Sequence, residues 1–200
     1  LCNASCASCH RNAMKREQGF MERELVEKCL LDIKSFPQPI QEVVPGNYGE
    51  MFIHPEWGEM LQLISKGLPG TRMVVPTNGT LLGNGNVEKL AQIRTLGLVN
   101  ISVNAFLPET YEAFHRLPAR FMADIQDSVI KLRELSPDVT ICISMVHDSQ
   151  YQSPKEVELF REHWSKYGIV QVNQAEYNNR PEREPLTPVS LPCRSLWSDL

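Results

Sequence analysis

Apolar side chains recur along this chain in two alternating patterns. In one pattern every third or fourth residue is apolar, which predicts helices; in the other, β-branched and aromatic residues form short runs between turn residues, which predicts strands. The predicted helices cover residues 21–36, 55–67, 86–97 with Gly97 as the stop, a stretch from Pro108, 122–135 and 153–168. The predicted strands lie within residues 41–50, 71–79, 98–106, 138–146 and 169–177.

Strands and helices thus alternate five times, which is the order typical of an α/β fold. Parallel strands need crossover connections, and a helix is the usual one. The alternation therefore predicts a parallel sheet with right-handed crossovers, either open or curled into a barrel.

Proline content marks the end of this pattern. Residues 178–192 contain four prolines in fifteen positions, which predicts an extended linker. Residues 1–177 are then expected to form one domain, and residues 193–200 the start of another. Because the chain begins with Leu1 rather than methionine, we expect it to be a trimmed piece of a longer protein.

The composition of the chain narrows the classes of binding partner that we expect. The chain has 200 residues, of which 42% are hydrophobic and 22% charged, and a net charge of -4, so it lacks the basic character of a general nucleic-acid binder. No apolar run approaches the roughly 18 residues that span a bilayer. We therefore expect neither a nucleic-acid partner nor a membrane partner.

Three of the six cysteines crowd into the first nine residues, as Cys2, Cys6 and Cys9, and the other three are scattered. This distribution predicts a metal site in a reducing compartment, for which the cytoplasm is the default. A C-x3-C-x2-C loop can supply three ligands of a four-iron cluster and leave the fourth iron open. The alternative is a structural zinc site that adds His10. A disulfide is disfavoured because it would leave one of the three cysteines unpaired.

Other unusual residues fall where predicted strands end. Gly49 and Glu50 follow the first strand, Asn78 follows the second, and Ser102 and Asn104 end the third. The carboxyl ends of parallel strands meet at one edge of a sheet, where ligands collect. The cysteine loop is expected at the same edge, so these residues should converge on one face.

Four segments in this order resemble the radical S-adenosylmethionine (SAM) superfamily. They are the loop "CNASCASC", then "YGEMFIHPEWGEML", "VVPTNGTLL" and "NISVNAFLPETYEAFHR". The resemblance extends from Leu1 to about Tyr177. It implies a partial (β/α)6 TIM-like barrel of parallel strands, whose first strand would precede Leu1 and is missing from this chain.

The resemblance also implies roles for individual residues. The cysteines would ligate three irons of a 4Fe-4S cluster, and the amino and carboxylate groups of SAM would chelate the fourth. The residues implied are Cys2, Cys6 and Cys9 for the cluster, Gly49 and Glu50 for the SAM ammonium, Ser102 and Arg116 for its carboxylate or ribose, and Asn78 and Asn104 as helpers. The histidines His54, His115 and His147 are expected to be structural, core or surface residues rather than catalytic bases.

The implied activity is reductive cleavage of SAM to a 5′-deoxyadenosyl radical, which abstracts hydrogen from a substrate. An electron donor such as flavodoxin or ferredoxin is implied. The segment "PCRSLW" resembles the opening of a SPASM or twitch extension, in which Cys193 would ligate an auxiliary iron–sulfur cluster. Members with that extension modify peptides, or oxidise or epimerise sugars and aminocyclitols. Two alternatives are a zinc-stabilised α/β binding module and an iron–sulfur electron carrier without SAM chemistry.

Overall fold

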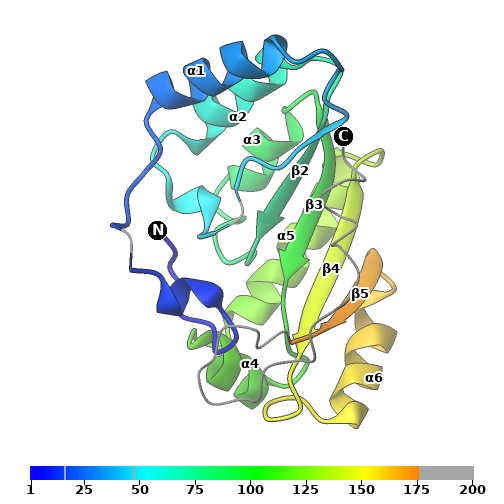
Figure 1. The fold of residues 1–200 in the computed structure, drawn as a ribbon. Coiled ribbons are helices and arrows are strands. Elements are labelled where there is room, and N and C mark those ends of the chain that lie inside the picture. Colours follow the sequence, from blue (N-terminus) through cyan, green and yellow to red (C-terminus); the bar gives the residue numbers. More distant parts are fainter. Residues whose placement is uncertain (16, 47, 176–200) are drawn as a thin grey trace, which may run out of the picture.

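The computed structural model describes residues 1–15, 17–46 and 48–175, and these form a parallel sheet with helices (Figure 1). The strands are β1 (Glu42–Val43), β2 (Arg72–Thr77), β3 (Leu96–Ser102), β4 (Thr140–His147) and β5 (Ile169–Gln174). The α-helices are α1 (Arg23–Lys34), α2 (Trp57–Gly67), α3 (Asn86–Ala91), α4 (Pro108–His115), α5 (Phe121–Leu135) and α6 (Pro154–Trp164). Two short 3-10 helices are η1 (His10–Ala13) and η2 (Met51–Ile53).

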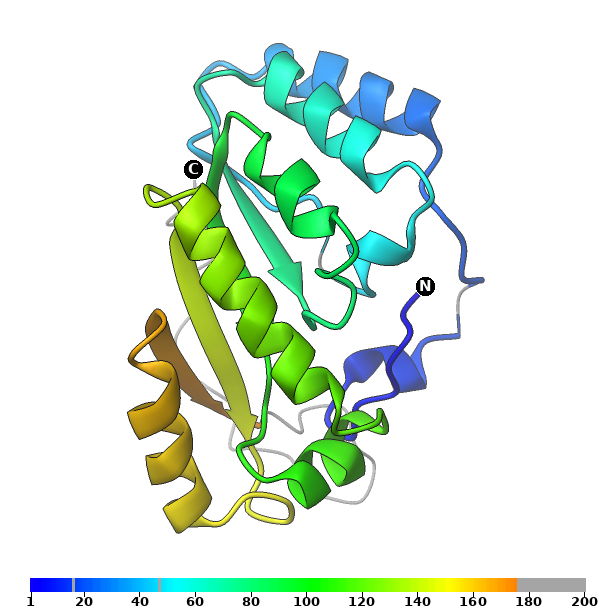
Figure 2. The same cartoon turned by 180° about the vertical axis from the view of Figure 1, so that it is seen from behind.

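The sheet order is β1-β2-β3-β4-β5, and every neighbouring pair is parallel. Each strand therefore lies beside the strand that follows it in the chain. Crossovers of one hand then place every connecting helix on the same face, and Figure 2 shows the helices in front of the sheet. Among the described residues no helix covers the opposite face (Figure 1). This arrangement is an arc of a (β/α) barrel, which confirms the predicted fold class.

The main core lies between the sheet and its helices. Alternate residues of β2 and β3, such as Val75 and Ile101, are fully buried and face that layer. Helix α5 contributes Ile125, Val129 and Leu132, which are also fully buried. No helix in the described part of the chain is long and apolar enough to cross a membrane.

The sequence prediction was wrong about where the third helix ends. That helix ends at Ala91, and Gly97 lies inside β3 rather than at a helix stop. A Cβ atom on Gly97 would lie 2.4 Å from Cγ of Arg72, so the glycine leaves room for the Arg72 side chain, which crosses it from strand β2. Apolar residues continue at helical spacing past Ala91, but the chain already pairs with β2, since Met73 donates its N–H to the carbonyl of Thr95 at 2.7 Å.

Candidate functional site: a cysteine loop at the strand ends

The first nine residues form a cysteine loop that is closed by its own hydrogen bonds. The N–H of Cys9 donates to the carbonyl of Cys6 at 3.1 Å, and the Asn12 side chain donates to the same carbonyl at 2.9 Å. The N–H of Ala4 approaches Sγ of Cys2 at 3.5 Å. The described cysteines are all free thiols. Hydrogen bonds, rather than a disulfide, therefore define the conformation of the loop.

The first anchor of the cysteine loop is the turn after β1. The N–H of Glu50 donates to the carbonyl oxygen of Leu1 at 2.9 Å. The preceding Gly49 has φ +115, and a Cβ atom there would lie 2.3 Å from that same oxygen. Only glycine accommodates both the positive φ and the close approach. Gly49 is therefore required for the loop to dock beside Glu50.

The second anchor is the turn after β2. The side chains of Asn3 and Asn78 pair at 2.8 Å, with Nδ2 of Asn78 donating to Oδ1 of Asn3. Asn3 in turn donates from Nδ2 to Oγ1 of Thr80 at 2.9 Å. Asn78 also accepts from Thr80 within the turn. Asn3 is therefore held on both sides by this turn.

The third anchor is helix α4, which follows β3. The N–H groups of Ala7 and Ser5 donate to the carbonyls of Phe114 and His115, at 2.8 and 3.4 Å. These are among the last carbonyls of the helix, which have no partner inside it. Segments that follow three neighbouring strands thus hold the cysteine loop (Figure 1). The predicted convergence at the carboxyl edge is confirmed for the loop, Glu50 and Asn78.

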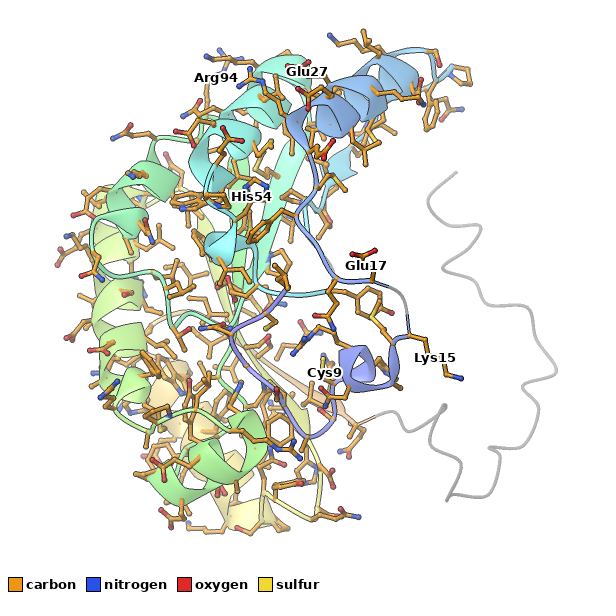
Figure 3. All side chains as sticks on the ribbon, turned by 90° about the vertical axis from the view of Figure 1, so that its left-hand side faces the viewer. Cys9, Lys15, Glu17, Glu27, His54 and Arg94 are labelled. Atoms are coloured by element: carbon orange, nitrogen blue, oxygen red, sulfur yellow. The ribbon has the colours of Figure 1, made fainter. Side chains whose placement is uncertain are left out.

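The three sulfur atoms of the loop share one electrostatic environment. The pKa of the Cys6 thiol is raised to about 12, first by burial and then by the neighbouring Cys9 and Cys2, while Arg11 opposes the rise. All three cysteines are half-buried, and Figure 3 shows Cys9 against the short helix η1. A group of thiolates is costly in such a place unless a bound cation compensates the charge.

This donor set fits a four-iron cluster. Each cysteine of such a cluster takes a different iron, so the three sulfurs need not point at a single atom. The zinc alternative requires convergence on one ion. Within residues 1–15, 17–46 and 48–175, no three His, Cys, Asp or Glu side chains are placed to hold one metal ion. Among the residues that the structure describes, the buried hydroxyl of Tyr111 has no hydrogen-bond partner, and burial and then Cys6 raise the pKa of this tyrosine.

Glu50 is buried and its carboxylate already has three donors. Oε1 accepts from Oγ1 of Thr77 at 2.9 Å and from the N–H of Phe52 at 3.3 Å, and Oε2 accepts from the N–H of Asn78 at 2.7 Å. A carboxylate offers about four acceptor positions, so about one remains. Burial raises the pKa of Glu50, and the three hydrogen bonds oppose that rise. Glu50 therefore joins the turns after β1 and β2 and has capacity for one more donor.

The other predicted SAM contacts lie further along the edge. Asn104 has φ +57 and accepts the N–H of Val146 at 2.7 Å, which joins the ends of β3 and β4. Oγ of Ser102 lies 3.3 Å from Oγ of Ser144. Arg116 is exposed and also has φ +57, and its side chain has no hydrogen bond or ion pair within the described residues. Ser102 and Arg116 make no hydrogen bond to the cysteine loop in the described part of the chain.

The sequence did not indicate the part that His115 plays. Its ring is fully buried, as expected for a core histidine, but Nδ1 lies 3.2 Å from Sγ of Cys6. Burial lowers the pKa of His115 to about 4, so the ring is neutral at physiological pH. The only sequence signal is its position directly before Arg116. The sequence also did not indicate the role of Asn3, because asparagine is a common loop residue.

A comparison with known families identifies the arrangement. The sequence model of the Radical SAM superfamily matches residues 1–160, which include the cysteine loop and all three of its anchors. The chain belongs to the radical SAM superfamily. Its cofactors are accordingly those of the family, a 4Fe-4S cluster and SAM.

Two curated relatives match parts of this radical SAM chain. A "tungsten-containing aldehyde ferredoxin oxidoreductase cofactor-modifying protein" from Pyrococcus furiosus is 32% identical over 92 residues, which is 46% of this chain and 25% of the relative. The "antilisterial bacteriocin subtilosin biosynthesis protein AlbA" from Bacillus subtilis is 27% identical over 113 residues, which is 56% of this chain and 24% of the relative. The matched regions thus span about a quarter of each relative.

Solved structures support the fold. The structure described as native anSMEcpe with bound AdoMet superposes with a TM-score of 0.72 at 16% identity, over 92% of this chain and 52% of the other. The structure of Streptococcus suis SuiB gives a TM-score of 0.66 at 14% identity, over 93% of this chain and 40% of the other. At such identities the likeness is one of fold alone.

The Gly49 anchor gives a first prediction. Gly49→Ala should displace the cysteine loop, because the added Cβ would collide with the Leu1 carbonyl. We expect iron content after anaerobic reconstitution to fall several-fold while the circular dichroism spectrum stays that of the parent. Gly58→Ala in α2 is the matched control, since a Cβ there meets nothing within 4 Å. Full iron content in Gly49→Ala would show that the loop tolerates the displacement.

Proposed function

We propose that this chain is the SAM-cleaving core of a radical SAM enzyme, with Cys2, Cys6 and Cys9 as the cluster ligands. The observation that carries the proposal is the tethering of three free thiols, on one short loop, to the turns after β1 and β2 and to α4. When bound, the cluster supplies the electron that cleaves SAM to a 5′-deoxyadenosyl radical. The residues of this chain position the bound SAM and supply the charged groups that bind it.

Glu50 is the proposed receptor for the SAM ammonium. Its remaining acceptor position can take one N–H of a cation as a charge-assisted hydrogen bond. The three donors already on the carboxylate fix its orientation, so it needs little rearrangement when SAM binds. Asn78 supports this geometry through its backbone N–H, and its side chain holds the cysteine loop through Asn3.

The remaining contacts are proposed for the rest of SAM. Arg116 is the C-cap of α4, with a left-handed backbone conformation, and its exposed side chain has no hydrogen bond or ion pair within the described residues. It is proposed to bind the SAM carboxylate or ribose. Ser102 is proposed for the same part of the ligand, and Asn104 as a helper. Ser102 of β3 is in register with Ser144 of β4 on the helix-free face of the sheet. Uncharged polar groups therefore line this end of that face.

The substrate proposal is a peptide, with a sugar or aminocyclitol as the second class. The bacteriocin-biosynthesis relative supports the peptide class. The cofactor-modifying relative supports a smaller substrate. An electron donor such as flavodoxin or ferredoxin, available in the reducing cytoplasm, completes the proposal.

The domain organisation stays a prediction. Residues 1–177 are proposed as the radical SAM core, residues 178–192 as a linker, and residues 193–200 as the start of a SPASM or twitch extension. The linker and Cys193, with its proposed auxiliary cluster, lie outside the described residues.

The proposed function is tested by reconstituting the chain anaerobically with iron and sulfide. We expect a brown protein that releases 5′-deoxyadenosine when it is reduced in the presence of SAM. A colourless product that retains zinc would contradict the proposal and support the binding module. A brown product that leaves SAM intact would contradict it and support the electron carrier.

A further inference from the structure

We propose that Arg11 is a positioning residue for the cysteine loop and supplies the positive charge that balances the bound cluster. The proposal rests on the proposed function, since it takes the three cysteines of the loop to be the cluster ligands. It gives a role to an arginine to which the sequence resemblance assigned none.

The guanidinium of Arg11 is folded back over the cysteine loop. Its Nη2 group donates to the carbonyl oxygen of Ala4 at 2.5 Å, and Ala4 is a buried residue between the first two cysteines. Arg11 lies in η1, two positions after the last cysteine, so this bond joins the start of the loop to the helix that follows it. Its Nη1 group donates to Oε1 of Gln18 at 3.1 Å. The positive charge is therefore held against the loop.

This charge has no counter-ion in the described part of the chain. Both acceptors on the guanidinium are uncharged, one a backbone carbonyl and the other a side-chain amide. The carboxylates of Glu17 and Glu50 line the same cavity as Arg11, but neither forms an ion pair with it. The Nε group of Arg11 is buried and has no hydrogen-bond partner among the described residues. Because an unpaired charge is costly to bury, this half-buried cation indicates that an anionic group belongs beside it.

The bound cluster is the anion that fits this place. Three thiolate ligands carry more negative charge than the oxidised four-iron core carries positive charge, and reduction adds a further electron. Arg11 acts electrostatically on one of the ligand sulfurs, because it opposes the rise in the pKa of Cys6. Lys15, the next basic residue along the chain, extends away from Cys9 (Figure 3). Arg11 therefore places a permanent positive charge at the loop, since a guanidinium does not lose its proton in proteins.

The consequence concerns the reduction potential of the cluster. A nearby positive charge stabilises the more negative, reduced cluster more than it stabilises the oxidised one. Arg11 is therefore expected to raise the potential, so that an electron donor reduces the cluster more readily. Removing the charge should make the cluster harder to reduce, and a different cation at the same position should restore much of the effect.

The test compares three substitutions of Arg11 with the parent chain. Arg11→Met and Arg11→Gln remove the charge, and the glutamine keeps an N–H donor for the Ala4 carbonyl, whereas Arg11→Lys keeps the charge. After anaerobic reconstitution to equal iron content, a redox titration followed by electron paramagnetic resonance should give a more negative midpoint potential for both uncharged variants. The potential of Arg11→Lys should lie between theirs and that of the parent.

Arg94→Met is the matched control. Arg94 is an exposed arginine at the amino end of β3, whereas the cysteine loop lies at the carboxyl edge of the sheet (Figure 3). Its substitution changes the net charge of the chain by the same amount as Arg11→Met. The control should keep the parent potential, because the effect depends on where the charge lies.

The outcomes separate this inference from the proposed function. Equal potentials in the parent and both uncharged variants would overturn the inference alone, and so would a shift in Arg11→Lys as large as theirs, since contact rather than charge would then be responsible. If the uncharged variants fold, as judged by circular dichroism, but only Arg11→Lys takes up a cluster, iron content supports the need for the charge. Loss of the cluster in all three would overturn it. A parent chain that takes up no cluster would overturn the proposed function and this inference with it.

Discussion

Cys6→Ala is expected to abolish cluster binding completely. Cys6 is the middle thiol of the loop, its backbone carbonyl closes the loop on Cys9 and Asn12, and its sulfur is the one that Cys2 and Cys9 influence electrostatically. Alanine keeps the backbone contacts and removes only the sulfur. Two remaining thiolates leave a second iron without a protein ligand, so a stable four-iron cluster should not form. Iron and sulfide analysis after reconstitution, with the visible absorption spectrum, measures the loss.

Cys29→Ala is the matched control for this prediction. Cys29 lies in α1 and is exposed, and it belongs to a different part of the chain from the cysteine loop. Its variant should take up as much iron as the parent and release as much 5′-deoxyadenosine from SAM. Equal iron content in the Cys6 and Cys29 variants would refute the ligand assignment.

Glu50→Ala is expected to reduce both stability and SAM affinity. The substitution leaves three donors, on Phe52, Thr77 and Asn78, without their acceptor in a buried site. At about 1–3 kcal/mol for each unsatisfied buried group, the free energy of unfolding should fall by at least about 3 kcal/mol. Loss of one charge-assisted hydrogen bond to the ammonium should weaken SAM binding about 10- to 150-fold. Urea unfolding and equilibrium dialysis with labelled SAM measure the two effects.

Glu156→Ala separates the two effects, because Glu156 is an almost identical buried carboxylate. It lies in α6 and accepts from the N–H groups of Phe106 and Leu107 and from Oγ1 of Thr110, at 2.9, 3.0 and 2.9 Å. Glu156→Ala therefore removes the same kinds of hydrogen bond as Glu50→Ala. Glu156 itself makes no hydrogen bond to the cysteine loop. Both variants should lose similar stability, and only Glu50→Ala should lose SAM affinity. Equal SAM affinities would show that Glu50 is purely a structural acceptor.

The pattern of apolar residues was enough to predict the sheet. Alternation of strands and helices depends on local periodicity, and parallel pairing follows because each crossover helix returns the chain to the same end. The exception, around Gly97, arose because apolar spacing continued past Ala91 while the chain had already begun to pair with β2. Pairing between strands is a tertiary interaction, so it overrode the local pattern.

The cysteine spacing was likewise sufficient to predict a loop with three metal ligands, since ligand type and spacing are properties of a short segment. Tertiary structure alone decided what holds that loop. The Leu1 contact at Glu50, the Asn3 pair with Asn78 and the His115 nitrogen on Cys6 join residues 49, 75 and 109 positions apart. No local pattern encodes such contacts, because they exist only once β1, β2 and β3 lie side by side and bring their carboxyl ends to one edge.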